Sequence, residues 1–244
     1  GRDFVLDKVF EKYKENFKYF VIFFILSVAM ALVTKSSNIT ALQSTELDIN
    51  YNFKEFLNAK NIVMVIVFTL LEVYIATYGL LLSRKAIKEE PIHMRDSLTE
   101  VFFFYPRILG LSIIFIVILI LLSLLIGGFI RLTTSFGFIM FNMILYLILI
   151  ILFGIFTHTI QNYLVYYDES IGSSIKGGII VGKRYFFRIL GLIILASLIG
   201  QLPNMKSAKA NWMIYVLGVF ILSIFNMFIN LYITNLCKVK GQRD

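Results

Sequence analysis

The sequence predicts an all-α integral membrane protein with six transmembrane helices. Hydrophobic residues make up 59% of the 244-residue chain and charged residues only 16%, against roughly 45–50% and about 25% in soluble domains. Uncharged apolar runs recur along the chain, and a run of about 20 such residues crosses the roughly 30 Å hydrocarbon core as a helix. An amphipathic stretch also precedes every second run. Together these observations exclude an ordinary soluble domain.

The sequence contains an internal repeat. The segment Arg-Ile-Leu-Gly-Leu occurs at 107–111 and again at 188–192, each time before a long apolar run. An acidic pair lies upstream of each copy, Glu89-Glu90 and Asp168-Glu169. Internal repetition of this kind indicates an architecture of repeated modules. We therefore predict a single membrane domain over 1–244, built from three units at about 3–82, 84–161 and 168–236. Each unit is an amphipathic helix followed by a transmembrane hairpin.

In the first unit, apolar residues recur at i+4 along 3–19, which predicts an amphipathic helix. This helix leads directly into a first span at 17–33. A polar connection at 34–61 precedes the second span at 62–82. The second unit starts with an amphipathic helix at 91–106, and Pro106 is expected to separate it, with a bend, from the third span at 108–130.

A tight turn at 131–135 leads to the fourth span at 136–156. The third unit starts with an amphipathic helix at 170–187. Its four glycines weaken it as a free helix and indicate close packing. The fifth apolar run, 189–202, gives only ~21 Å of helix. It must therefore begin within 185–187, thin the bilayer or re-enter without crossing, and we predict that it crosses. The sixth span is 212–236.

The distribution of basic residues predicts the orientation. Of the 23 Lys and Arg residues, 17 lie in the N-terminal segment through Lys18, at 84–107, at 161–188 and in the C-terminal tail. The positive-inside rule then places both termini and all three amphipathic helices on the cytoplasmic side of a bacterial cell membrane. We expect these helices to lie in the membrane interface, with basic side chains toward anionic headgroups. A collar of helices packed on one another is the alternative.

Glu72 is the sharpest candidate for a functional site, because it lies at the centre of the second span. An ionisable residue at that depth costs roughly 2.5–3.5 kcal/mol. Two interpretations stay open: a proton-, cation- or ligand-binding site, or a protonated carboxyl bonded across helices. Ser223, Asn226 and Asn230 share one face of the sixth span, and Asn226 is near the same depth. They are candidate partners of Glu72 or simple interhelical contacts.

The sequence lacks the motifs expected of a catalytic or metal-binding site. His158 lacks a second ligand at metal-binding spacing, and Cys237 is the only cysteine. The sequence contains no phosphate-binding glycine loop, catalytic triad order or zinc helix motif. We expect no metal and no cofactor, and an enzyme is disfavoured. The net charge of +8 follows the membrane boundaries rather than any nucleic-acid-binding motif, so nucleic acid is not an expected partner.

The segment 165–171, with 174–176, 181–184 and 188–191, places an acidic residue before an amphipathic helix that ends in basic and aromatic residues. This arrangement resembles uncharacterised bacterial six-span membrane-protein families. They are related to the membrane domain found beside some glycerophosphodiester phosphodiesterases. These residues have no counterpart of the phosphodiesterase's catalytic barrel, so the resemblance implies a fold and no enzymatic activity.

Two classes of function follow from the sequence. The first is a non-enzymatic membrane protein that engages anionic lipids, a partner membrane protein or another copy of itself through the cytoplasmic helices. Arg107, Lys183, Arg184 and Arg188 are its expected headgroup contacts. The second is a transporter subunit with a polar site at Glu72, Asn226 and Asn230. A solvent-connected cavity at Glu72 favours the second class, and a filled interior favours the first.

Overall fold

In the computed structural model, the described residues are 3–36, 59–131, 135–205 and 211–241. All regular structure in these ranges is helical. The helices are α1 (Asp3–Ser36), α3 (Ala59–Lys88), α4 (Met94–Arg131), α5 (Phe136–Tyr167), α6 (Ile171–Arg184), α7 (Phe186–Ile199) and α9 (Trp212–Gly241). A short 3-10 turn, η2 (Leu202–Asn204), follows α7. The all-α prediction is confirmed, and most of the predicted polar connection at 34–61 lies outside the described residues.

Six stretches are long and apolar enough to cross a membrane. They are Leu6–Ser36, Ile62–Lys88, Met94–Gly128, Phe136–Tyr167, Phe186–Asn204 and Trp212–Val239. The fifth begins at Phe186, upstream of the apolar run at 189–202, and continues through η2 for 19 residues. Only α7, 14 of these residues, is α-helix, and it supplies about 21 Å at 1.5 Å per residue; a turn at 200–201 and η2 complete the stretch.

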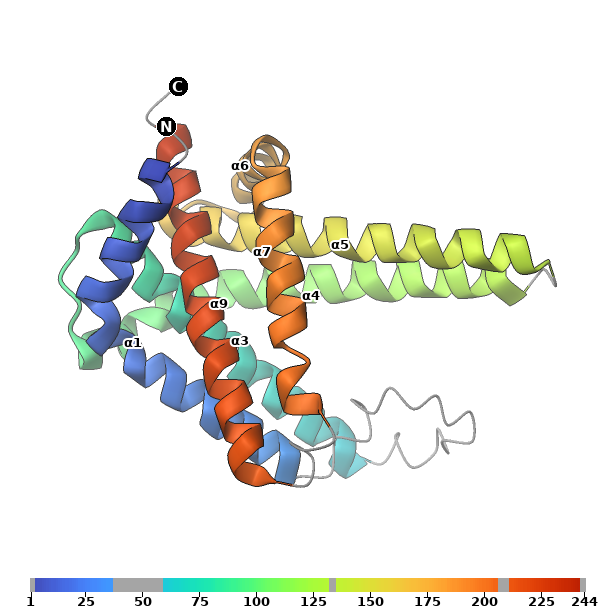
Figure 1. The fold of residues 1–244 in the computed structure, drawn as a ribbon, viewed down its shortest axis with the longest axis horizontal. Helices are drawn as coiled ribbons and strands as arrows, with labels where there is room; N and C mark the ends of the chain where they lie inside the picture. Colours follow the sequence, from blue (N-terminus) through green and yellow to red (C-terminus); the bar gives the residue numbers. More distant parts are fainter. Residues whose placement is uncertain (1–2, 37–58, 132–134, 206–210, 242–244) are drawn as a thin grey trace.

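The axes of the helices run in two main directions. Figure 1 shows α7 and α9 running along the height of the molecule, with both chain ends at the top, while α4 and α5 form a long hairpin that projects sideways. α1 and α9 are antiparallel neighbours. The Tyr13 hydroxyl donates to the Ile224 carbonyl at 3.1 Å, and the Tyr215 hydroxyl donates to the Ala31 carbonyl at 3.2 Å.

The core lies where the hairpin meets the other helices. Side chains less than 2% exposed come from six of the helices: Phe20, Phe24, Tyr78, Leu81, Leu82, Ile87, Ile108, Leu111, Ile155, Leu164, Ile189 and Met227. The far half of the hairpin contributes little to this core. Leu121, Leu124 and Phe141 there are 60%, 68% and 61% exposed. Apolar surfaces of this size mark sites of contact with membrane lipid or with another protein.

The predicted separation at Pro106 is wrong, because α4 continues through it without interruption. A proline removes one helical hydrogen bond, but tertiary contacts hold the residues on both sides of it. The Tyr105 hydroxyl donates to the Leu70 carbonyl of α3 at 3.1 Å. Arg107 is bound to the end of α5. The chain does break between α6 and α7, at Tyr185.

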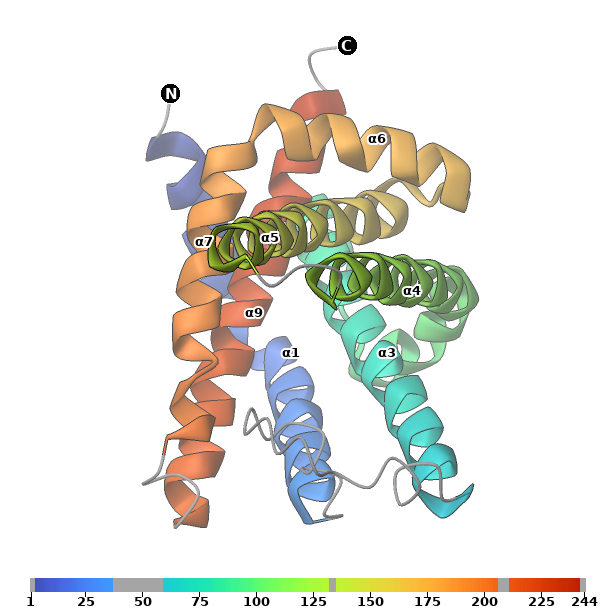
Figure 2. The ribbon, with the colours of Figure 1, turned by 90° about the vertical axis from the view of Figure 1, so that its right-hand side faces the viewer.

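Three of the four glycines of α6 allow the close packing that the sequence indicated. A Cβ atom on Gly178 would lie 2.5 Å from the Ile160 Cα of α5, and one on Gly177 would lie 2.2 Å from the ring of Tyr163. Gly182 approaches Phe156 in the same way, whereas Gly172 has nothing within 4 Å. α6 therefore covers α5 with its small face, and Figure 2 shows it lying across the end of the molecule that carries both termini.

Helices α3 and α5 end in the same way. Glu89 and Asp168 adopt left-handed backbone angles, with φ of 61° and 58°. The next amide returns to the helix in each case, from Glu90 to the Lys85 carbonyl and from Glu169 to the Leu164 carbonyl. Such a bond from the residue after a left-handed cap closes the last turn of the helix. Each acidic side chain pairs with a base from an earlier helix: Glu89 with Lys12 at 3.2 Å and Asp168 with Arg107 at 2.7 Å.

Candidate functional site

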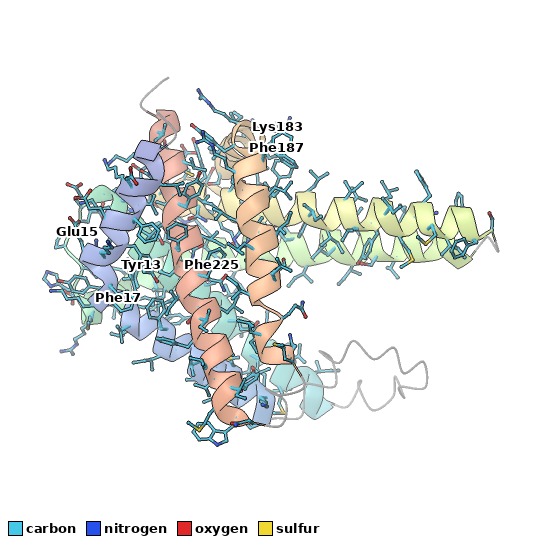
Figure 3. All side chains as sticks on the ribbon, viewed as in Figure 1. Tyr13, Glu15, Phe17, Lys183, Phe187 and Phe225 are labelled. Carbon is cyan, nitrogen blue, oxygen red and sulfur yellow. The ribbon has the colours of Figure 1, made fainter. Side chains whose placement is uncertain are left out.

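The corner between α6 and α7 carries an exposed basic surface, here called the basic patch. Its basic members, Lys176, Lys183, Arg184 and Arg188, are all exposed, and within the described chain none of them pairs with a carboxylate. Ile180 and Phe187 lie among them, 51% and 84% exposed. Figure 3 shows Lys183 and Phe187 close together at this corner. The spacing along the two helices places four charges and two large apolar side chains on one outer surface.

The expected headgroup contact Arg107 is placed differently. Its guanidinium donates to the Asp168 carboxylate at 2.7 Å and to the Glu169 carbonyl at 3.0 Å. The group also lies 5.0 Å and 5.1 Å from the ring centres of Phe103 and Phe104. Arg107 thus holds α4 to the end of α5. Of the four expected headgroup residues, the structure brings together Lys183, Arg184 and Arg188 and places Arg107 apart from them.

Glu72 lines an open cavity of about 280 Å³, here called the Glu72 cavity. The other lining residues come from α1, α3 and α9: Phe23, Ser27, Met30, Ala31, Thr34, Ile75, Ala76 and Tyr215. Its wall is mainly apolar, and Glu72 is the single carboxylate among these residues. The face of α3 that carries Glu72, Ala76 and Gly79 turns toward α1, because Glu72 and Ala76 line the cavity together with α1 residues. There, a Cβ atom on Gly79 would lie 2.8 Å from the Phe23 ring.

The expected partners of Glu72 on α9 do not line this cavity. Ser223 is buried and donates to the Phe220 carbonyl of its own helix, Asn226 is exposed and Asn230 is half-buried. Tyr215 is the α9 residue at the cavity, and Asn226 is 11 positions further along the helix, or about 16 Å at 1.5 Å per residue. The antiparallel register with α1 therefore separates Asn226 and Asn230 from Glu72.

A polar pair that the sequence did not indicate links α9 to α5. The Thr234 hydroxyl donates to the Asn162 side-chain carbonyl at 2.7 Å, and both residues are at most 2% exposed. The Asn162 amide in turn donates to the His158 carbonyl. Thr234 lies four positions after Asn230 on α9, and Asn162 lies near the end of α5. Periodicity within each helix gave no signal that the two would meet.

A second cavity lies at the end of α3 and was not anticipated. It measures about 440 Å³ and is here called the charged cleft. Its lining residues are Leu81, Arg84, Lys85, Glu90, Pro91, His93, Asp96, Glu100, Phe103, Phe104 and Asp168. The only sequence signal for it is the concentration of opposite charges between residues 84 and 100. Charges of both signs distinguish it from the uniformly basic patch.

Ion pairs organise the surroundings of this cleft. Lys85, which is 6% exposed, lies 2.6 Å from Glu100 and donates to the Ser97 hydroxyl at 3.2 Å. On the other side of the α3–α4 turn, Lys12 bonds to Glu89. This hydrogen bond and the charge of Lys12 hold the pKa of Glu89 below its usual value of 4.5. The turn is thereby fastened to α1.

No group of three or more His, Cys, Asp or Glu side chains arranged to hold a metal ion occurs in the described part of the chain. No known family model matches this chain, and no similar curated protein or solved structure was found. The resemblance to the six-span bacterial families stays a prediction. The features that bear on function are therefore the chemistry of the basic patch and of the two cavities.

Proposed function

We propose that this protein is a non-enzymatic, multi-pass protein of the cell membrane that binds anionic lipid headgroups through the basic patch. The observation that carries the proposal is the exposure of Lys176, Lys183, Arg184 and Arg188, without a carboxylate partner in the described chain, around the exposed side chain of Phe187. Four uncompensated charges at the beginning of an apolar helix have the composition of a headgroup-binding surface.

The two kinds of side chain in the patch act together. A basic residue near an anionic membrane surface contributes about 1 kcal/mol of attraction. Phe187 and Ile180 contribute by burying apolar surface among the acyl chains, at about 25 cal/mol per Å². The starts of α1 and α4 differ from the patch, because Asp7, Glu11 and Glu15, or Asp96 and Glu100, accompany their basic residues. Among the three predicted amphipathic segments, the third is therefore the best suited to anionic lipid.

We also propose the orientation of the protein in the membrane and the duplication of its structural unit. Both termini and α6 are assigned to the cytoplasmic side by the charge distribution. The matching left-handed ends at Glu89 and Asp168 support a duplicated unit, as does the burial of Ile108 and Ile189 at equivalent positions of the repeated segment, 1% and 0% exposed. In this interpretation each acidic pair links its own unit to the preceding one.

Native mass spectrometry in equal mixtures of phosphatidylglycerol and phosphatidylcholine tests lipid binding. The variant K183Q/R184Q/R188Q removes three charges from the patch, and K8Q/K14Q/K18Q removes three from α1 as a matched control. We expect wild type and control to retain phosphatidylglycerol preferentially, and the patch variant to lose that preference by about tenfold or more, since each charge contributes about 1 kcal/mol.

Equal preference in all three proteins would contradict lipid binding by the patch. So would a protein subunit that co-purifies in stoichiometric amount and is lost only from the patch variant while the lipid preference persists. That outcome would assign the patch to a protein partner instead.

The Glu72 cavity favours a second candidate function, a transporter subunit that binds a lipophilic cation. A single carboxylate in a largely apolar cavity complements an organic cation whose charge is surrounded by hydrocarbon. The proposal involves Glu72 without Ser223, Asn226 or Asn230. Tetraphenylphosphonium is the probe, and we expect wild type and E11Q, which alters an exposed carboxylate of α1, to bind it while E72Q does not. Equal binding by E72Q would exclude this function.

A further inference from the structure

The charged cleft has a different chemistry from the basic patch. Three structural elements form it: the end of α3 with the following turn, the start of α4, and the end of α5 at Asp168. The lining includes two basic side chains, Arg84 and Lys85, one histidine, His93, and four carboxylates, Glu90, Asp96, Glu100 and Asp168. An acidic lining is notable in a chain whose net charge is +8.

Part of this charge is already neutralised within the protein. Lys85 pairs with Glu100 at 2.6 Å, and Asp168 pairs with Arg107 at 2.7 Å. Glu90 lies 3.9 Å from Arg84 and also interacts with the charge of Lys88, and Asp96 forms no ion pair with the described residues. The lining charges that remain available are thus one guanidinium, Arg84, and two carboxylates, Glu90 and Asp96.

Arg84 is incompletely satisfied. Its Nε atom is buried and has no hydrogen-bond acceptor in the described structure. The guanidinium lies 5.2 Å from the centre of the Phe104 ring, and Arg107 lies 5.1 Å from the same ring. Arg84 also lines the cleft, so a ligand that supplies an acceptor oxygen there forms a charge-assisted hydrogen bond with its guanidinium.

A ligand of a single charge does not fit these groups. A simple anion would satisfy Arg84 but would be repelled by the surrounding carboxylates. A simple cation would satisfy Glu90 and Asp96 but would leave Arg84 without an acceptor. A zwitterion meets both requirements, and the cleft volume of about 440 Å³ accommodates a small polar group with water.

We propose that the charged cleft binds a phosphoethanolamine group, with its phosphate toward Arg84 and its ammonium toward Glu90 and Asp96. Two sources share this chemistry: the headgroup of a membrane lipid and a free soluble zwitterion. Phe103, which is 63% exposed, forms part of the wall. The cleft lies at the end of the second candidate span, Ile62–Lys88, where headgroups are found. The site is distinct from the basic patch and does not depend on the patch binding anionic lipid.

The test compares lipids that differ only in N-methylation. The purified protein in detergent is given equal amounts of phosphatidylethanolamine and phosphatidylcholine with matched acyl chains, and bound lipid is measured by native mass spectrometry. The quaternary ammonium of phosphatidylcholine has no N–H to donate to a carboxylate. We expect wild type to retain phosphatidylethanolamine about tenfold over phosphatidylcholine, the effect of one hydrogen bond to a charged group.

D96N is the informative variant, because Asp96 is exposed and its substitution leaves the core unchanged. We expect D96N to lose the preference and D7N, an exposed carboxylate of α1, to retain it. E90Q provides a second variant with the same expectation as D96N. The patch variant K183Q/R184Q/R188Q should keep the preference, which separates this site from the proposed function.

Free phosphoethanolamine identifies the source of the ligand. Displacement of bound phosphatidylethanolamine by an equal concentration of the free compound would support the site and assign it to a soluble zwitterion. Displacement only at a large excess would support the site and assign it to the lipid. No preference for phosphatidylethanolamine in the wild type, or an undiminished preference in both D96N and E90Q, would overturn the proposal.

Discussion

Gly178 illustrates how one residue sets the distance between two helices. The position of its missing side chain is 2.5 Å from the Ile160 Cα, and a backbone atom cannot move aside as the end of a flexible side chain can. Gly172, on the same helix, has open space around it. Replacing each glycine with alanine therefore gives a comparison: both substitutions change the helix propensity, but only the one at Gly178 also changes the packing.

We predict that G178A destabilises the protein and that G172A does not. Alanine favours the helix by up to about 1 kcal/mol at either position, but overpacking at Gly178 costs about 1–3 kcal/mol. The temperature of unfolding in detergent, followed by circular dichroism, is the measurement. A G178A variant as stable as G172A would show that α6 does not pack on α5 at this distance.

The buried pair of Thr234 and Asn162 is a second local constraint. Removing the hydroxyl in T234V leaves the Asn162 carbonyl without this donor. We predict a loss of about 0.6–2 kcal/mol, the range for polar contacts between membrane helices. S197A is the control, because Ser197 is exposed and bonds only to its own helix. The measurement is the unfolding temperature of each variant. If the α5–α9 contact were absent, T234V and S197A would change the unfolding temperature by the same amount.

Between elements, the contact of Glu89 with Lys12 ties the α3–α4 turn to α1. The hydrogen bond and charge of Lys12 lower the pKa of Glu89 in the folded protein. A carboxyl group with a depressed folded pKa contributes stability above its unfolded pKa, and this contribution is lost as pH falls through the folded pKa. The contribution is small, because the pair is exposed to solvent.

We therefore predict that E89Q is less stable than wild type at neutral pH and that the difference disappears as pH falls below about 4.5. Unfolding temperatures of the two proteins across this range are the measurement. E11Q serves as the control, because Glu11 forms no ion pair with the described residues. A difference that grows toward acid would contradict the assigned direction of the pKa shift.

For the molecule as a whole, the central question is how the α4–α5 hairpin sits in the membrane. The hairpin projects across the direction of α7 and α9 (Figure 1), and Figure 2 shows it nearly end-on. Helices that cross in this way cannot all lie along the normal of one bilayer. If the hairpin lay wholly within the hydrocarbon, its connecting backbone would lose its partners in water, at a cost of several kcal/mol per group.

We accordingly predict that the hairpin crosses the bilayer in cells and that its orientation relative to α7 and α9 changes there. The variant S135C, in a background with C237S, should react with a membrane-impermeant maleimide added from outside. S173C, on the exposed face of α6, should react only after permeabilisation. Protection of S135C from outside, with labelling after permeabilisation, would indicate four spans and a hairpin that does not cross.

The sequence alone determined the class of the protein, its helices and its candidate spans. These properties depend on local composition and on the 3.6-residue period, which a single chain displays directly. The separation of α6 from the fifth span and the close packing of its glycines followed from the same patterns. Sequence patterns did not predict that α4 continues through Pro106. The helix continues because the distant contacts of Tyr105 and Arg107 outweigh one lost hydrogen bond.

Which polar residues meet depends on how the helices align in the folded protein. Periodicity gives the face of a helix on which a residue lies, but not the height at which two helices align, and each position of offset moves a side chain by 1.5 Å. That register places Thr234 against Asn162 and separates Asn226 from Glu72. It also binds Arg107 to Asp168 and gathers the charges of the cleft from three elements. The partners of each charge are thus a property of the folded chain.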